Sequence, residues 1–204
     1  MAGVDTEPGG TDPGGTDPGG TDPDGAGGGS GRVADDLDVV DVFVEVPMGS
    51  RNKYEWDFAR NAMVLDRTLY SAVQYPGDYG FVPDTLARDG DHLDALCILG
   101  VPTFPGCTVA ARIVGVLDMR DEAGPDEKLL VVAENDPRWR GLRELEDVPQ
   151  HLLDEIAQFF ATYKELEAKE VVVDGWRDRA HAHDVLADAR RRYVGVPPSR
   201  RYPT

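Results

Sequence analysis

The chain has 204 residues, of which 38 are acidic and 21 are basic, so its formal net charge is -17. This length suits one domain with extensions, and it is enough to bury a sizeable core. The charge opposes binding to nucleic acid or to an anionic membrane, and it favours a cationic partner such as a divalent metal. The opening residues MAGVDTEPGG lack the basic and apolar regions of a signal peptide, and no stretch approaches the roughly 20 apolar residues that span a bilayer. We therefore expect a cytoplasmic protein.

Residues 1–35 form a segment of different composition from the rest. The stretch GGTDPGGTDPGGTDPDG repeats a five-residue unit of Gly, Thr, Asp and Pro, and it offers almost no apolar side chain to bury. We predict a disordered, solubilising tail; a partner-binding motif or a calcium-binding repeat is the alternative, although the spacing matches no metal loop. The folded domain is predicted at residues 36–195, with a flexible C-terminus at residues 196–204.

Strand signals begin near residue 39. The stretches VVDVFVEVP at 39–47 and KYEWD at 53–57 alternate in the two-residue period of a strand. Further apolar runs lie at 94–99, 109–118 and 128–133, and Gly and Pro separate them. This pattern predicts a small, closed antiparallel sheet.

The period changes to that of a helix in the last third of the chain. In QHLLDEIAQFFATYKELEA, residues 150–168, the apolar side chains form one helical stripe that ends at Tyr163. A weaker helix is predicted from about Arg177 to Tyr193. The fold class is therefore α+β, mainly β: a barrel with helices packed on it.

Three aspartates crowd together in RDGDHLDALC, where Asp89, Asp91 and Asp94 stand directly before an apolar strand. In an extended chain Asp94 points away from the other two, so the three converge only through a bend, which Gly90 permits. A hairpin turn would explain Asp-Gly-Asp alone. The third carboxylate is harder to explain, because neighbouring like charges raise one another's pKa unless a cation neutralises them. Such hard oxygen ligands suit magnesium or manganese.

A second acidic cluster lies in DMRDEAGPDEK, where Asp121 and Asp126 flank Gly124 and Pro125, so that the loop can fold back and bring both carboxylates together. A polar surface loop is the alternative. Two clusters could hold more than one metal, the arrangement that stabilises attacking and leaving oxygens in phosphoryl transfer. Donors suited to phosphate oxygens are Lys53, Arg67, Lys164, Tyr75, Tyr79 and Tyr163. Solvated lysines and core tyrosines are the alternatives, and spacing does not decide between them.

Six motifs then carry a resemblance: EVPMGSRNKYE, LDRTLY, YPGDYGFVPDTL, DGDHLDAL, DEAGPDEK and ATYKELE. Their order and separations resemble those of family I soluble inorganic pyrophosphatases, especially the bacterial ones, from about Val39 to Val185. The resemblance implies a five-stranded OB-like barrel with flanking helices and hydrolysis of pyrophosphate to two phosphates. It also implies several Mg²⁺ ions per active site, with Mn²⁺ or Zn²⁺ as possible substitutes, and a homohexamer.

The resemblance also assigns roles to individual residues. Asp91 resembles the general base that orients and deprotonates a water shared by two metals. The metal ligands implied are Glu45, Glu55, Asp89, Asp94, Asp121 and Asp126. The phosphate-binding residues implied are Lys53, Arg67, Tyr79, Lys128, Tyr163 and Lys164, with Asp66 and Tyr75 as supports.

One position departs from the family pattern: His92 stands where Pro, or sometimes Glu, is usual. We expect an exposed, tolerated substitution; a shift of pH optimum or metal preference is the alternative hypothesis. Three other functions are less favoured. A nucleic-acid-binding OB protein would need a basic groove, a nucleotide phosphohydrolase would need a base pocket, and an inactive relative would lack catalytic residues that this chain has.

Overall fold

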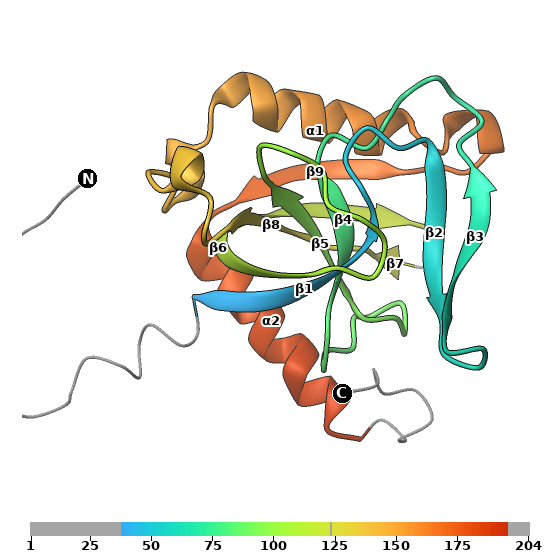
Figure 1. Cartoon of the computed structure of the whole chain (residues 1–204), viewed down its shortest axis with the longest axis horizontal. Helices are drawn as coiled ribbons and strands as arrows, with labels where there is room; N and C mark the ends of the chain where they lie inside the picture. The colour runs from blue at the N-terminus through green and yellow to red at the C-terminus, as the bar shows by residue number, and fades with distance from the viewer. Residues whose placement is uncertain (1–37, 123, 196–204) are drawn as a thin grey trace, which may run out of the picture. The chain divides into compact units, whose positions relative to one another are not determined.

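The computed structural model describes residues 38–122 and 124–195 (Figure 1). The tail predicted at 1–35 and the flexible C-terminus predicted at 196–204 lie outside the described residues. In chain order the strands are β1 (Val39–Val46), β2 (Asn52–Asp57), β3 (Ala62–Thr68), β4 (Asp78–Val82), β5 (Leu93–Ile98), β6 (Thr108–Asp121), β7 (Gly124–Pro125), β8 (Lys128–Ala133) and β9 (Val172–Arg177). The helices are α1 (Gln150–Thr162) and α2 (Arg179–Tyr193), and short 3-10 turns lie at Pro137–Trp139, Leu145–Asp147 and Glu165–Glu167.

Five strands close into a ring. β1 pairs with β4, β4 with β5, β5 with β8, β8 with β6, and β6 returns to β1. An odd number of strands cannot alternate in direction all the way around a ring, and the pair β5–β8 is the parallel one. The predicted five-stranded, OB-like closed sheet is confirmed, but it contains this one parallel pair and is not antiparallel throughout.

Alternate residues of the ring strands belong to two apolar clusters. On β8, Leu129 and Val131 belong to one cluster, whereas Leu130 and Val132 belong to the other, and all four are fully buried. Helix α2 completes the first cluster and helix α1 completes the second. Because β8 is covered on both faces, its sequence KLLVVA reads as a continuous apolar run instead of an alternating one.

The two helices follow the predicted patterns closely. Most of the predicted stripe of α1 is buried, including Ile156 and Phe160, but the helix ends at Thr162 and the chain continues as a 3-10 turn. Helix α2 begins after Asp178, whose carboxylate accepts a hydrogen bond from the backbone N–H of His181 at 2.9 Å. Figure 1 shows α1 on one side of the ring beside β9, and α2 on the opposite side. Among the described residues, no helix combines the length and apolarity needed to cross a bilayer.

Strands β2 and β3 form a separate two-stranded sheet beside the ring (Figure 1). The sequence patterns did not predict β3, β4 or β9. Strand β4 has the unpromising sequence DYGFV, yet it is wholly buried. Its Gly80 is required, because a Cβ atom there would lie 1.9 Å from the carbonyl oxygen of Phe43 on β1.

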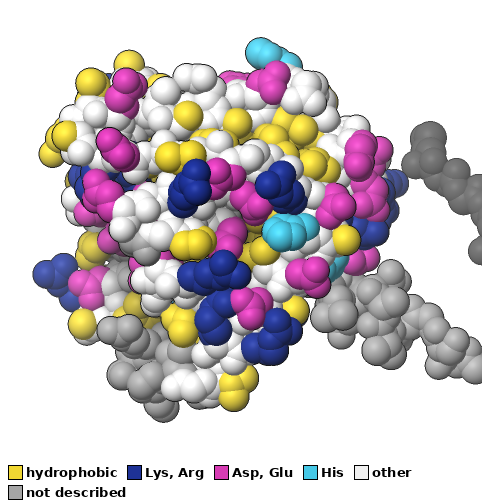
Figure 2. Space-filling model, turned by 180° about the vertical axis from the view of Figure 1, so that it is seen from behind, with side chains coloured by type: hydrophobic (Ala, Val, Ile, Leu, Met, Phe, Trp, Pro, Cys, Tyr) yellow, Lys and Arg dark blue, Asp and Glu magenta, His cyan; other side chains and the backbone are white. Residues whose placement is uncertain are grey.

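Charges of both signs are interspersed on the surface. On the face drawn in Figure 2, Lys and Arg side chains stand among Asp and Glu side chains. Ion pairs also occur elsewhere in the described structure, such as Arg177 with Asp118 at 3.1 Å and Arg179 with Glu144 at 2.7 Å. Exposed pairs of this kind contribute little to stability.

Candidate active site

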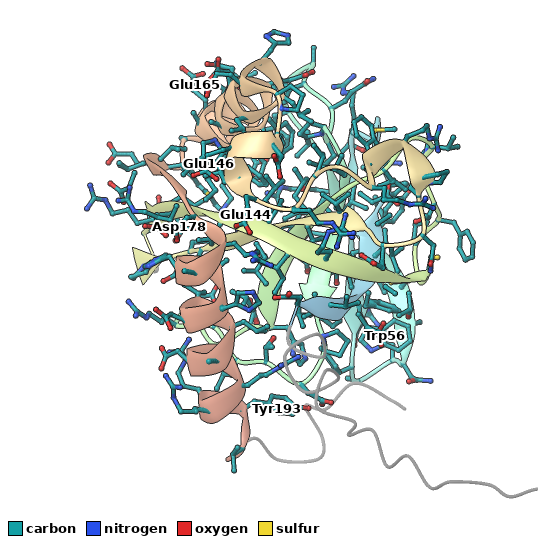
Figure 3. The ribbon with its side chains drawn as sticks, turned by 90° about the vertical axis from the view of Figure 1, so that its left-hand side faces the viewer. Trp56, Glu144, Glu146, Glu165, Asp178 and Tyr193 are labelled. Atoms are coloured by element: carbon teal, nitrogen blue, oxygen red, sulfur yellow. The ribbon has the colours of Figure 1, made fainter. Side chains whose placement is uncertain are left out.

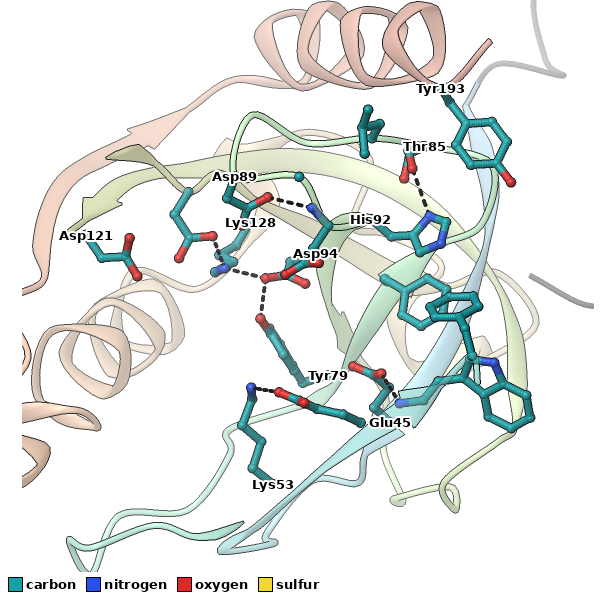
Figure 4. Close-up of a pocket in the computed structure, with 18 of the residues that line it drawn as sticks. Glu45, Lys53, Tyr79, Thr85, Asp89, His92, Asp94, Asp121, Lys128 and Tyr193 are labelled. Carbon is teal, nitrogen blue, oxygen red and sulfur yellow. Dashed lines mark hydrogen bonds and ion pairs between the residues drawn. The ribbon is translucent and has the colours of Figure 1, made fainter. Parts of the chain in front are cut away.

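A pocket of about 580 Å³ opens beside the ring, and its lining has two ends (Figure 4). The acidic end is lined by Glu45, Glu55, Asp89, Asp91, Asp94, Asp121 and Asp126 together with Lys53, Lys128, Lys164, Tyr79 and Tyr163. The aromatic end is lined by Trp56, Phe58, Phe81, His92 and Tyr193. Every residue to which the family resemblance assigned catalysis, metal binding or phosphate binding lines the acidic end, except Arg67.

The bend predicted for the aspartate motif is present. Gly90 has a φ of +98°, in the left-handed region that favours glycine. Asp89 and Asp91 lie in this bend, whereas Asp94 lies on β5, and all three side chains line the pocket. The backbone N–H of Asp91 donates to the Asp89 carboxylate at 3.1 Å, and the carbonyl of Asp91 accepts from Ala87 N–H at 2.7 Å. The backbone of the bend is therefore held by local hydrogen bonds.

The second acidic cluster also folds back as predicted. Asp121 ends strand β6, where it pairs with Gly124 of the short strand β7. The backbone N–H of Asp126 then donates to the carbonyl of Met119 at 2.8 Å. This hairpin brings Asp121 and Asp126 to the same pocket as the first cluster.

Lys128 joins the two clusters at the floor of the pocket. Its ammonium donates to the carboxylates of both Asp94 and Asp126, and the residue is only 3% exposed. The Tyr79 hydroxyl also donates to Asp94. Burial alone would lower the pKa of Lys128, but Asp94 and Asp126 outweigh burial and raise it. The ammonium thus stands between two carboxylates, where any cation would be stabilised.

Negative charge is in excess at the acidic end, where seven carboxylates face three lysine ammonium groups. Burial raises the pKa of Glu45 to about 8, although its carboxylate accepts a hydrogen bond from Trp56 N–H at 2.8 Å. Partial burial, and then the charge of Asp94, raises the pKa of Asp91. Burial likewise raises the pKa values of Asp89 and Asp126. A bound cation would favour the ionised form of these carboxyl groups against both burial and their mutual repulsion.

The donor set fits a hard divalent metal in kind, because it consists of carboxylate oxygens. Within 38–122 and 124–195, however, no three Asp, Glu, His or Cys side chains are grouped closely enough to ligate one ion. Ligation of one ion by three of these side chains would therefore require side chains at the acidic end to rotate. Lys128, which draws Asp94 and Asp126 to its own ammonium, is the group that such a rotation would displace.

Lysine and tyrosine side chains complete the acidic end. Lys53 pairs with Glu55, and Lys164 pairs with Asp121 at 3.0 Å. Tyr163 is 4% exposed and stacks on Phe159 with ring centroids 5.2 Å apart, so it both packs in the core and lines the pocket. Tyr75, predicted as a support, is buried beside Tyr79 at 5.3 Å between ring centroids and does not line the pocket.

Arg67 lies beside the pocket instead of lining it. Its guanidinium pairs with Asp66 and with Glu167, whose side chain is 7% exposed. Burial would lower the pKa of Arg67, but these two carboxylates raise it. The sequence analysis did not single out Glu167, because only the fold brings residues 67 and 167 together.

His92 is not the exposed residue that we predicted from its sequence. Its ring stacks on Phe81 with centroids 4.7 Å apart and an interplanar angle of 15°, and its Nδ1 atom lies 2.8 Å from the carbonyl oxygen of Thr85. Phe58 and Tyr193 lie nearby, at 5.5 and 5.8 Å between ring centroids. Burial lowers the pKa of His92. These rings come from separate elements, so no local motif could have revealed the aromatic end.

Comparisons with known proteins agree with one another. A family model described as inorganic pyrophosphatase matches residues 42–194. An inorganic pyrophosphatase of Methanosarcina mazei is 53% identical over 153 residues, which cover 75% of this chain and 90% of that protein. One of Halalkalibacterium halodurans is 46% identical and covers 80% of this chain and 100% of that protein. The crystal structure of inorganic pyrophosphatase from Thermus thermophilus matches with a TM-score of 0.76 and 46% identity, over 82% of this chain and 95% of that one.

Proposed function

The chain belongs to the inorganic pyrophosphatase family, and from that premise we propose that it hydrolyses inorganic pyrophosphate to two phosphates with magnesium and a water activated by Asp91. As a member of this family it is a hydrolase of the phosphoanhydride bond. The observation that carries the proposal is the excess of carboxylates over ammonium groups at the acidic end of the pocket. Pyrophosphate alone would be repelled there, so cations must accompany it.

The proposed metal ligands are six carboxylates that line the pocket, Glu45, Glu55, Asp89, Asp94, Asp121 and Asp126. The raised pKa values of Glu45, Asp89 and Asp126 and the oxygen-only chemistry of the whole set support this role. Bound magnesium would supply a lowered pKa for the attacking water and would neutralise charge on the phosphates. Mn²⁺ and Zn²⁺ are possible substitutes.

Asp91 is proposed as the general base. It lies in a bend whose backbone is hydrogen bonded, while its side chain lines the pocket. Partial burial and the charge of Asp94 raise the pKa of Asp91, and a carboxylate with a higher pKa is a stronger proton acceptor. Asp91 would orient the attacking water and take its proton.

Cationic and hydroxyl donors are proposed to bind the phosphates: Lys53, Arg67, Tyr79, Lys128, Tyr163 and Lys164. Lys128 would turn from Asp94 and Asp126 toward a phosphate oxygen once those carboxylates are neutralised. Such donors disperse the negative charge that develops on the leaving phosphate.

Nucleotides are a second candidate substrate class, because the aromatic end offers rings on which a base could stack. We favour pyrophosphate, since His92 and Phe81 already stack on each other. The cytoplasmic location and the homohexamer stay predictions from the sequence and the family.

Phosphate release from pyrophosphate and from ATP, each with and without magnesium, tests the proposal. We expect fast release from pyrophosphate that requires magnesium, and little release from ATP. Equal release from ATP would favour the nucleotide alternative. No release from folded, magnesium-loaded protein would overturn the proposed function.

A further inference from the structure

Arg67 is clamped by two carboxylates from different parts of the chain. Its Nε atom donates to Oε1 of Glu167 at 3.0 Å, its Nη2 atom lies 3.0 Å from Oε2 of the same carboxylate, and its Nη1 atom donates to Asp66. The pair with Glu167 is bidentate, the geometry that fixes the plane of a guanidinium. These contacts use three of the five guanidinium N–H bonds and leave one on each terminal nitrogen.

The position of this pair connects two elements that carry pocket residues. Arg67 lies on β3 of the separate two-stranded sheet, directly opposite Lys53 on β2. Glu167 lies in the 3-10 turn that follows Tyr163 and Lys164. The Arg67–Glu167 pair therefore ties the β2–β3 hairpin to the segment after α1, and Lys53, Tyr163 and Lys164 on these elements all line the pocket.

Two positive charges face each other in the hairpin, which would be unfavourable without compensation. Asp66 contacts both, since its carboxylate pairs with Arg67 and lies 3.7 Å from the Lys53 ammonium. Glu167 then supplies a second negative charge to Arg67 from the opposite element. Arg67 is thus held beside the pocket in one orientation.

We propose that Glu167 is a positioning residue that orients Arg67 so that its two remaining N–H bonds meet a phosphate oxygen of pyrophosphate. The inference rests on the proposed function and adds a residue to it. Glu167 itself does not line the pocket and acts only through Arg67. Because an oriented guanidinium strengthens binding before and during the reaction alike, its loss changes KM more than kcat.

The test compares Glu167→Gln with a matched control, Glu165→Gln, in the full-length protein. Glutamine keeps the shape of Glu167 and removes its charge, so folding is preserved. Glu165 belongs to the same 3-10 turn, but its side chain is exposed (labelled in Figure 3). We expect Glu167→Gln to raise KM for pyrophosphate about tenfold, equivalent to about 1.4 kcal/mol of binding, with a smaller change in kcat. The control should match the parent.

A double-mutant cycle adds Glu167→Gln to Arg67→Lys. If Glu167 acts through Arg67, the second substitution adds little to the loss in kcat/KM, whereas a separate role gives additive losses. Additive losses, or an unchanged or lowered KM in Glu167→Gln, would overturn the inference; a lowered KM would mean that Glu167 sequesters Arg67. An inactive parent would instead overturn the proposed function, so the two failures are distinguishable.

Discussion

The acidic and aromatic ends of the pocket differ in how well their side chains are stabilised by their neighbours. At the acidic end, carboxyl groups outnumber lysines, and burial raises the pKa of Glu45 and of Asp91, so ionising these groups is unfavourable in the metal-free protein. At the aromatic end, His92 and Phe81 stack and a hydrogen bond to Thr85 fixes the imidazole, so the side chains are already satisfied. The same bend, from Asp89 to His92, belongs to both ends. Unfavourable ionisation is therefore concentrated where chemistry is proposed, whereas the contact of His92 with Thr85 helps to hold the bend in place.

The largest effect is expected from Asp91→Asn at the acidic end. Loss of a general base lowers rates by about 100-fold to 10,000-fold, so kcat should fall within this range. Because the Asp91 side chain is at most partly buried in its bend, the melting temperature should stay close to that of the parent. Steady-state kinetics and thermal unfolding check both points. A kcat within a few-fold of the parent would exclude Asp91 as the base.

Lys128→Met should cost stability when divalent metals are absent. Removing the buried ammonium leaves Asp94 and Asp126 without their shared cation, and breaking such a buried pair costs about 3 kcal/mol. Urea unfolding in the presence of a chelator measures this loss. Lys169→Met, at an exposed position, is the matched control. If both variants unfold alike, Lys128 does not stabilise the acidic end.

The pH dependence of stability should reveal Glu45. Its pKa is about 8 in the folded protein against an ordinary 4.5, so the folded state binds the proton more tightly. Stability from this group is therefore lost as pH rises from about 4.5 to about 8. In metal-free protein, the free energy of unfolding of Glu45→Gln relative to that of the parent should rise by on the order of 2 kcal/mol between pH 5 and pH 8. This is less than the full pKa difference implies, because solvent reaches the side chain. A constant difference across this range would contradict the account, and exposed Glu170→Gln is the control.

The smallest effect is expected at the aromatic end, from His92→Pro. The change removes one hydrogen bond and one ring stack, which together contribute about 1–2 kcal/mol to stability. Activity should fall far less than in Asp91→Asn, because His92 holds the bend without touching substrate. His151→Ala, exposed at the start of α1, is the control. A loss of kcat as large as that of Asp91→Asn would remove the distinction between the two ends.

The sequence predicted what depends on local patterns. The two helices and the strands of the alternating and apolar runs could be read from periodicity, and the bend at Gly90 from its position between two aspartates. Strand β4 could not, because DYGFV is stabilised by ring closure and by the close approach of Gly80 to Phe43. The parallel pair β5–β8 could not be predicted either. It follows from the odd number of strands in the closed ring, and the sequence of one strand does not reveal that number.

The candidate site was predicted well where its residues share motifs and poorly where they do not. The predicted metal ligands and the predicted base all line one pocket, since three of them share one bend and strand and two flank one hairpin. His92 was misjudged because its partners Phe81 and Tyr193 come from other elements. Glu167 was missed for the same reason, as its partner Arg67 is distant in sequence.

Thermal unfolding with magnesium tests most directly the central claim, that the crowded carboxylates bind divalent cations. The parent protein and Asp94→Asn would each be melted in magnesium chloride and in sodium chloride of equal ionic strength, which separates binding from screening. At magnesium concentrations about 100 times the Kd, binding adds about 2.7 kcal/mol, so the parent's Tm should rise by roughly 5–10 °C, and that of Asp94→Asn by much less. Equal Tm values for the parent in the two salts would contradict the account.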